Sequence, residues 1–223
     1  MQIFAVLVAG GIGSRMKSEI PKQFLTLINK PVFIHTIEKF QQAIPEIQII
    51  LVLPEEHVAT GQDLLNDFHS SANISITTGG MTRFHSVQNG LSCIRENGIV
   101  LVHDAVRCLV STQLISKSVE ACKNYGSAIP VVASKDSVRI KSDNQYKVAD
   151  RNDVMLVQTP QVFHADILKQ AFKAAYNDTF TDEATVVEHA GHTLHFVEGE
   201  INNIKITTPV DLLIAEQVIL KQS

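Results

Sequence analysis

The sequence predicts an α/β fold with a doubly wound, mostly parallel sheet and a projecting β-hairpin. Short apolar, β-branched runs alternate with amphipathic segments of helical length, which is typical of a parallel sheet covered by helices. A glycine-rich loop follows the first apolar run directly, and a polar hairpin interrupts the alternation at Lys135. A chain of 223 residues can bury one large core, so we expect a single domain over 1–223 with an arm at approximately 135–152.

Strands and helices are predicted in strict alternation up to residue 133. Strands are expected at Ile3–Val8, Ile47–Leu53, Ile74–Thr77, Ile99–His103 and Ala128–Ala133. Helices are expected near 31–43, 55–68, 82–96 and 112–124, with Pro31 in a first turn and Thr112 as a cap. In such sheets ligands bind beyond the carboxyl ends of the strands, where the glycine-rich loop lies.

The second part of the chain departs from this pattern. Residues 136–140 and 146–149 flank a polar turn, and their alternating side chains are too polar to fill a core, so this hairpin should project. After it we expect a strand at 154–157, a helix near 164–176, a helix opened by 181–183, a strand at 194–197 and a helix from about 209. Lys205 is expected on a short strand before that last helix, which Thr208 and Pro209 begin.

Charge and the N-terminal sequence exclude several classes of protein. The chain has 19 basic and 23 acidic residues and a net charge of -4, so it offers no general basic field to nucleic acid. The first apolar run lacks a preceding positive region and reaches the glycine loop after a few residues. We therefore expect neither a signal peptide nor a membrane span, and a cytoplasmic protein.

The cysteines and clustered histidines predict neither disulfides nor a zinc site. Cys93, Cys108 and Cys122 are odd in number and lack metal-ligand spacing, which favours reduced thiols. Histidines recur at 189, 192 and 195, but Gly191 interrupts them and 193–197 alternates like a strand. The three rings are therefore expected at the surface or in packing contacts.

The loop at residues 9–23 indicates polyphosphate chemistry, because exposed backbone N–H groups converge there with Arg15 and Lys22. A dinucleotide fingerprint and a P-loop would both need a glycine where Met16 stands. What remains, Gly-Gly-x-Gly-x-Arg followed seven residues later by Lys22, resembles the signature loop of sugar-nucleotide and alditol-nucleotide pyrophosphorylases. A tight glycine turn with two solvated cations is the structural alternative.

A second candidate site residue, Asp104, follows the predicted strand at Ile99–His103. Asp104 at its carboxyl end, opposite a triphosphate loop, could share Mg²⁺ with phosphate oxygens. A helix cap or loop carboxylate is the structural alternative. His103 is expected to be packed or hydrogen-bonded within the strand rather than catalytic.

The motifs in order resemble the 2-C-methyl-D-erythritol 4-phosphate cytidylyltransferase family. They are Ala-Gly-Gly-x-Gly-x-Arg-Met from residue 9, Pro-Lys-Gln (21–23), Gly-Gly (79–80) with Arg83 and Ser86, His-Asp-Ala-x-Arg (103–107), Asp-Arg-Asn (150–152), Gln-Thr-Pro-Gln (158–161), Thr-Asp-Glu-Ala (181–184) and Asn-Ile-Lys-Ile-Thr-Thr-Pro-x-Asp-Leu (203–212). The resemblance covers nearly the whole chain. It implies a nucleotide-diphospho-sugar transferase-like variant of the Rossmann fold.

The resemblance also implies a reaction and roles for particular residues. CMP would pass from CTP to 2-C-methyl-D-erythritol 4-phosphate, giving CDP-methylerythritol and pyrophosphate in non-mevalonate isoprenoid biosynthesis, with a divalent cation such as Mg²⁺. The implied roles are Arg15, Lys22 and Lys205 at the phosphates, Ala9, Gly10, Gly80 and Ser86 at the cytosine, Asp104 and Ala105 at the ribose and metal, and Arg107, Thr159 and Thr181 at the methylerythritol.

The hairpin resembles the family's dimerisation arm, which implies a homodimer in which Ser137 and Arg151 reach the partner's substrate phosphate. Three positions depart from the family pattern. Ser137 replaces the usual threonine but keeps the hydroxyl, Met81 stands where aspartate is frequent, and Cys108 replaces proline after Arg107.

Three other functions compete with this reading. Ribitol-5-phosphate cytidylyltransferases share the fold, the CTP site and most of the motifs. A non-catalytic nucleotide-binding module is disfavoured because Arg15, Lys22, Asp104 and Lys205 are all retained. A dehydrogenase is disfavoured by Met16 and by the lack of a ribose-binding acid after the second strand.

Overall fold

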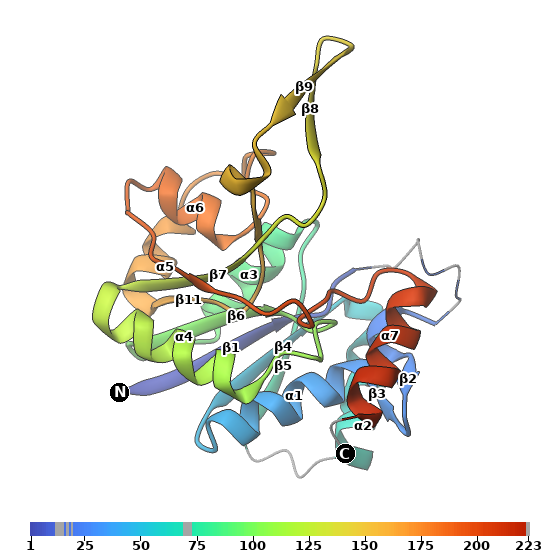
Figure 1. The fold of residues 1–223 in the computed structure, drawn as a ribbon. Coiled ribbons are helices and arrows are strands. Elements are labelled where there is room, and N and C mark those ends of the chain that lie inside the picture. The colour runs from blue at the N-terminus through green and yellow to red at the C-terminus, as the bar shows by residue number, and fades with distance from the viewer. Residues whose placement is uncertain (12–15, 17, 19, 69–72, 222–223) are drawn as a thin grey trace.

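The computed structural model describes residues 1–11, 16, 18, 20–68 and 73–221 and centres on one mixed sheet. The strand order is β10-β7-β11-β6-β1-β4-β5, with β12 beside β7 (Figure 1). The strands are β1 (Gln2–Val8), β4 (Gln48–Leu53), β5 (Ile74–Thr78), β6 (Gly98–Asp104), β7 (Ser127–Ala133), β10 (Met155–Val157), β11 (Gln161–His164) and β12 (Phe196–Glu198). Strands β5, β4, β1 and β6 run parallel, so their carboxyl ends share one edge.

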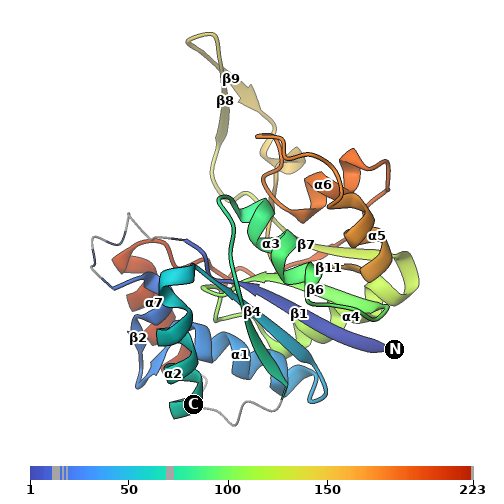
Figure 2. The same cartoon turned by 180° about the vertical axis from the view of Figure 1, so that it is seen from behind.

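Helices cover both faces of this sheet, as the predicted doubly wound fold requires. One face packs against α1 (Val32–Ala43), α2 (Val58–Phe68) and α4 (Thr112–Tyr125), and the other against α3 (Arg83–Ser92), α5 (Ala165–Ala171) and α6 (Glu183–His189) (Figures 1 and 2). Strand β1 contributes side chains to both faces: Ala5 and Leu7 pack in the core under α1, α2 and α4, while Phe4 and Val6 pack in the core under α3, α5 and α6. A strand segment buried on both sides must be apolar, and β1 is apolar from Ile3 to Val8, with Gln2 at its half-buried start.

A smaller layer at one end carries the last helix. Helix α7 (Pro209–Leu220) packs with the short hairpin of β2 (Thr26–Leu27) and β3 (Lys30–Pro31) around a third cluster of buried residues. Short 3-10 turns in the described part of the chain include η2 (Lys22–Phe24), η3 (Glu55–His57) and η4 (Arg151–Asp153). Among the described residues, no helix combines the length and the apolarity needed to cross a bilayer.

The predicted strands up to residue 133 and the helix after Thr208 are confirmed, but the second half differs in three places. Strand β11 was not predicted; it lies antiparallel between β6 and β7 and makes the sheet mixed. Lys205 was expected on a strand, whereas residues 203–207 form no regular secondary structure. The helix expected near 164–176 ends at Ala171.

Two predicted helix starts are corrected. Helix α4 is capped by Ser111, whose hydroxyl accepts a hydrogen bond from the Leu114 N–H, so Thr112 is its first residue rather than its cap. Pro31 precedes α1 and pairs in β3 instead of lying in the first helical turn.

The hairpin of β8 (Val138–Ser142) and β9 (Gln145–Ala149) extends from the body of the molecule (Figure 1). These two strands form a two-stranded sheet of their own and pair with no other strand among the described residues. Asp143 and Asn144 form the turn with φ values of 47° and 65°, which is the left-handed geometry that a tight hairpin needs. We call residues 135–152 the arm.

Candidate functional site

A cavity of about 210 Å³ opens at the carboxyl edge of the sheet. The register places it there: Val8 at the end of β1 pairs with Asp104 at the end of β6, and the next residue, Ala9, donates its N–H to the Val52 carbonyl of β4 at 2.9 Å. Its lining comes from these strand ends, from η2, from the segment before α3 and from the segment before α7. The lining residues are Val8, Ala9, Gly10, Gly11, Lys22, Gln23, Gly80, Met81, Thr82, Arg83, Ser86, Asp104, Val106 and Lys205.

One wall is built from two glycine segments that meet at Ser86. The Ser86 hydroxyl accepts the Gly80 N–H at 3.1 Å and donates to the Thr82 carbonyl at 3.0 Å, which fixes the turn before α3. A side chain at Gly80 would come within 2.4 Å of His85 Cβ, and one at Gly10 would fill the space next to the Ser86 hydroxyl at 3.6 Å. This wall therefore exposes backbone to a ligand, as the close approach of a flat ring or a phosphate requires.

Asp104 is the one carboxylate in the described lining, and it faces three cations. Lys205 Nζ lies 3.0 Å from Oδ2, Arg107 Nε lies 3.3 Å from Oδ2, and Arg83 Nε lies 3.4 Å from Oδ1. Burial would raise the pKa of Asp104, but Arg83, Lys205 and Arg107 together hold that pKa well below its usual range. The carboxylate is thus ionised at neutral pH and locally outnumbered by positive charge.

A buried hydrogen-bonded pair supports the end of β6 from behind. Asp104 N–H donates to the Thr159 hydroxyl at 3.1 Å, and that hydroxyl lies 3.0 Å from His103 Nδ1. Burial lowers the pKa of His103 to about 3, so the ring is neutral and its Nε2–H donates to the Arg107 carbonyl at 3.2 Å. Nδ1 then accepts the Thr159 proton. His103 is a packed, hydrogen-bonded residue, as predicted.

Lys22 and Gln23 reach the cavity from η2, which the neighbouring Phe24 anchors. The Phe24 ring packs edge-on against Phe33 and His57, at centroid distances of 5.7 and 5.6 Å. Lys22 is buried and donates from Nζ to the Ile206 carbonyl at 3.1 Å, which holds the ammonium on the same side as Lys205. The Gln23 amide is buried with no hydrogen-bond partner for its nitrogen or its oxygen among the described residues.

The structure brings together only part of the predicted site. Ala9, Gly10, Lys22, Gly80, Ser86, Asp104 and Lys205 all line the cavity. Ala105 does not: it is fully buried, with its N–H donated to the Val8 carbonyl and its carbonyl accepting from Thr36. Thr159 is also outside the lining, because its hydroxyl is committed to Asp104 and His103.

The remaining predicted residues lie around the cavity or outside the description. Arg107 turns one guanidinium nitrogen to the Asn203 carbonyl at 2.7 Å, next to its contact with Asp104. Thr181 is exposed before α6, and Ser137 and Arg151 are exposed at the two ends of the arm. Arg15 lies outside the described residues.

Sequence reasoning missed one charged member of the lining. Arg83 lines the cavity and joins Asp104 to Glu183, a buried carboxylate from α6. Both residues stand inside motifs noted above, but nothing in their spacing shows that they meet, because they are 100 positions apart. The histidines at 189 and 195 contact the rings of Phe180 and Tyr125, as expected of packing residues.

Comparisons with known proteins identify the family. The model of the 2-C-methyl-D-erythritol 4-phosphate cytidylyltransferase family matches residues 3–222. A protein of that name from Phocaeicola vulgatus is 45% identical over 219 residues, covering 98% of this chain and 100% of the relative. The relative from Bacteroides thetaiotaomicron is 42% identical, with the same coverage.

Solved structures agree with the sequence match. The 4-diphosphocytidyl-2C-methyl-D-erythritol synthase of Anaerococcus prevotii superposes with a TM-score of 0.84 at 27% identity and covers 98% of both chains. The 2-C-methyl-D-erythritol 4-phosphate cytidylyltransferase of Francisella tularensis gives 0.81 at 31% identity, covering 97% of this chain and 99% of its own. The chain belongs to the 2-C-methyl-D-erythritol 4-phosphate cytidylyltransferase family, a family of nucleotidyltransferases.

Proposed function

We propose that this chain transfers CMP from CTP to 2-C-methyl-D-erythritol 4-phosphate, releasing pyrophosphate, in isoprenoid biosynthesis. The observation that carries the proposal is the cavity at the carboxyl edge of the sheet, where exposed glycine backbone faces Lys22, Lys205 and a single carboxylate, Asp104. Membership of the cytidylyltransferase family supports the nucleotide and the acceptor.

The cations suit an in-line displacement at phosphorus. An oxygen of the acceptor's phosphate attacks the α-phosphorus of CTP, the bond from that phosphorus to the bridging oxygen breaks, and pyrophosphate leaves with the electron pair. The attacking phosphate is already largely ionised at neutral pH, so no strong general base is needed. Lys22 and Lys205 supply positive charge where negative charge develops, and the cavity holds the reactants in line. Arg15 is proposed to assist Lys22 at the phosphates.

The donor set at Asp104 fits a divalent cation that is shared with substrate. Mg²⁺ in nucleotide enzymes is held by one or two carboxylates together with phosphate oxygens and water. The described lining contains one carboxylate, and no group of three metal-ligating side chains occurs among the described residues, so a cage made of protein alone is not expected. We propose that Asp104 would hold Mg²⁺ together with the triphosphate, and that the ion would neutralise charge on the departing pyrophosphate.

The acceptor is proposed to lie between the cavity and the base of the arm. Arg107 beside Asp104 and the exposed Thr181 before α6 both carry groups that could bind a phosphate or a hydroxyl. Ser137 and Arg151 at the arm's ends do not line this chain's own cavity. We propose that they contribute to the acceptor site of a partner subunit instead.

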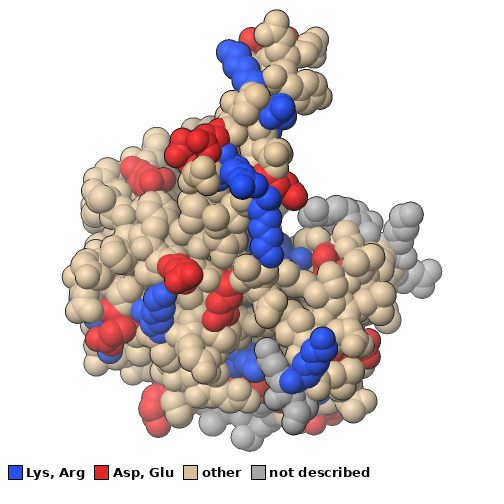
Figure 3. Space-filling model, in the orientation of Figure 1, with Lys and Arg blue, Asp and Glu red and all other residues tan. Residues whose placement is uncertain are grey.

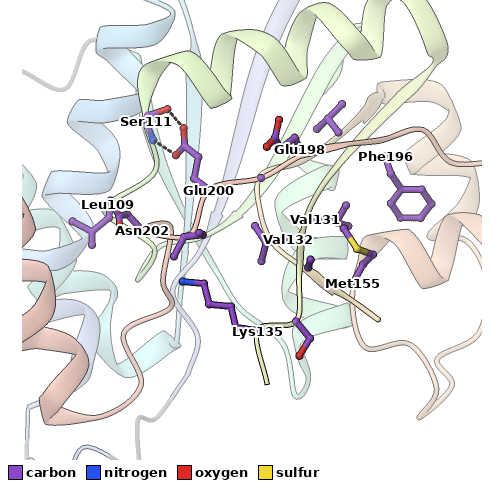
Figure 4. A pocket seen from close by; sticks show the side chains of 15 residues that line it. Leu109, Ser111, Val131, Val132, Lys135, Met155, Phe196, Glu198, Glu200 and Asn202 are labelled. Atoms are coloured by element: carbon purple, nitrogen blue, oxygen red, sulfur yellow. Dashed lines mark hydrogen bonds between the residues drawn. The ribbon is translucent and has the colours of Figure 1, made fainter. Parts of the chain in front are cut away.

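A homodimer would explain the exposed apolar surface of the arm and its base. Ile140, Tyr146 and Val148 of the arm are 59%, 67% and 73% exposed. Below the arm, a groove of about 900 Å³ lies over β7, β10 and β12, where Met155 and Phe196 are also exposed (Figure 4). Apolar surface of this extent marks an interaction site in a water-soluble protein.

The same region carries charge that a partner could meet. Figure 3 shows basic and acidic side chains around the base of the arm.

We also propose a cytoplasmic location. The chain's three cysteines are free thiols, which fits a reducing compartment.

A direct assay tests the function. Purified protein is incubated with Mg²⁺, with each of CTP, UTP, ATP and GTP, and with 2-C-methyl-D-erythritol 4-phosphate, while pyrophosphate and the nucleotide product are measured. Pyrophosphate should form in amounts equal to CDP-methylerythritol, with CTP strongly preferred and no release without acceptor. Absence of turnover with CTP from a folded protein would refute the proposal.

A further inference from the structure

Arg83 lies between the carboxylates of Glu183 and Asp104, and it donates more hydrogen bonds to Glu183 than to Asp104. Its two terminal nitrogens form a two-pronged ion pair with Glu183: Nη1 donates to Oε1 and Nη2 donates to Oε2 at 3.1 Å. Only Nε is directed to Asp104, at the longer distance of 3.4 Å. The guanidinium therefore belongs chiefly to Glu183, although Arg83 lines the nucleotide cavity.

Glu183 is held firmly in this position. Its side chain is 1% exposed and it is the first residue of α6, where the helix dipole favours an anion. Gln161 of β11 fixes the same turn, because its amide nitrogen donates to Asp182 at 2.9 Å and its amide oxygen accepts the Ala184 N–H at 2.8 Å. Asp182 caps the helix through the Thr185 N–H.

Burial and mutual attraction act in opposite directions on the pKa of each member of this pair. Burial alone would lower the pKa of Arg83, but Glu183 and Asp104 raise it above its usual value, so the guanidinium stays charged. Burial raises the pKa of Glu183, and Arg83 opposes that rise. The two-pronged geometry is that of an ionised pair.

Without Glu183, Arg83 would be a competitor for Asp104. A guanidinium binds a carboxylate best through two parallel N–H donors, and Asp104 is the nearest other carboxylate. Asp104 already faces Lys205 and Arg107. A two-pronged contact from Arg83, in place of its present single Nε contact, would make Asp104 a poorer ligand for Mg²⁺, because the ion would have to displace a stronger set of contacts.

We propose that Glu183 is a positioning residue that acts through Arg83: it holds both terminal nitrogens of the guanidinium, limits the contact of Arg83 with Asp104 to the single Nε donor, and so keeps that carboxylate available to a cation bound with the triphosphate. This inference rests on the proposed function, in which Asp104 meets the metal and CTP. It assigns a role to Glu183 of the Thr-Asp-Glu-Ala segment. A substrate contact would not explain this residue, since Glu183 is buried outside the cavity lining.

The test measures CTP binding by calorimetry as Mg²⁺ is increased, without acceptor, so that no turnover occurs. Glu183→Gln keeps the shape and one acceptor for Arg83 but removes the charge. We expect the Mg²⁺ concentration at half-maximal CTP binding to rise about three- to tenfold, while kcat at saturating Mg²⁺ stays close to that of the unsubstituted protein. Glu188→Gln, on the exposed side of the same helix, is the matched control and should leave the midpoint unchanged.

A second variant separates positioning from a general structural role. Glu183→Gln combined with Arg83→Gln removes the competing cation as well, so the Mg²⁺ midpoint should return to the original value or fall below it. It also keeps the test valid if the single variant folds poorly, because no buried charge is then left unpaired. A merely structural pair would make the double variant at least as impaired as the single one.

The outcomes distinguish this inference from the proposed function. An identical Mg²⁺ midpoint in folded Glu183→Gln, or no recovery in the double variant, overturns the inference and leaves the function standing. CTP binding that does not respond to Mg²⁺ in the unsubstituted protein removes the metal assignment at Asp104, and the inference with it. Loss of turnover with CTP in the assay above is the separate result that would refute the function.

Discussion

The carboxyl end of β6 and the arm are both rich in polar residues, yet they differ in where those residues find partners. At the end of β6, the groups of His103, Asp104 and Thr159 are paired inside the chain, in a region with almost no solvent exposure. Along the arm, the strands pair only with each other, and most side chains are exposed. The polar groups at the end of β6 therefore find their hydrogen-bond partners within the chain itself.

This difference shows which residues the fold alone can account for. A buried polar group persists only where its hydrogen bonds are made, so the β6 end is specified by the same contacts that stabilise it. A two-stranded hairpin is marginally stable by itself, and the apolar side chains of Ile140, Tyr146 and Val148 are largely exposed in the described part of the chain. We therefore expect the end of β6 to act within its own chain and the arm to act through contacts with a partner.

The largest effect is expected at the cations of the nucleotide loop. Lys22→Ala should lower kcat by about two orders of magnitude, because it removes a fixed positive donor to the developing charge at phosphorus. Arg15→Ala should have an effect of similar size. Steady-state pyrophosphate release measures the loss, and Lys117→Ala, which removes an exposed lysine on α4, is the matched control. Near-normal turnover in both loop variants would contradict the assignment.

Asp104→Asn should lower activity by about one to two orders of magnitude and flatten its dependence on Mg²⁺, because asparagine keeps the shape without the charge that a divalent cation requires. The measurement is a Mg²⁺ titration of kcat/KM. Asp143→Asn is the control from the arm: it makes the same substitution at the hairpin turn and should leave the titration unchanged. If the two variants behave alike, Asp104 has only a structural role.

Thr159→Val should destabilise the fold by about 1–3 kcal/mol, because it leaves the buried Asp104 N–H without an acceptor and His103 Nδ1 without a donor. Urea unfolding gives the free energy. Ser142→Ala removes an exposed hydroxyl from the arm and should change stability by less than about 0.5 kcal/mol. Equal effects at the two positions would erase the contrast between the regions.

The arm's contribution should appear only between subunits. Lys22→Ala and Arg151→Ala proteins should each be inactive as homodimers, and mixing them should restore activity, because one site of the heterodimer holds both residues. Random exchange of equal amounts predicts recovery of roughly a quarter of the original sites. No recovery despite demonstrated subunit exchange would mean that Arg151 acts within its own chain or not at all.

The sequence predicted the parallel half of the sheet well because each of its strands is a clear apolar run rich in β-branched residues, separated from the next by a segment of helical length. Strand β11 was not predicted because its four residues after Thr159-Pro160 are too short a pattern to distinguish a strand from a loop. Its position between β6 and β7 depends on contacts between residues far apart in the sequence. The cavity was located from the loop and strand ends, but the pairing of Arg83 with Glu183 joins residues 100 positions apart. Only the folded chain shows that contact.

The most direct test of the account compares kcat/KM for 2-C-methyl-D-erythritol 4-phosphate and ribitol 5-phosphate at saturating CTP. Both acceptors are short polyol phosphates, so phosphate contacts bind them alike, and the branch methyl must carry much of the discrimination. A methyl pocket contributes about 1–3 kcal/mol, so we expect a preference of roughly 10- to 200-fold for the methylerythritol with measurable activity on the ribitol. A clear preference for ribitol 5-phosphate would contradict the assigned acceptor while leaving cytidylyl transfer intact.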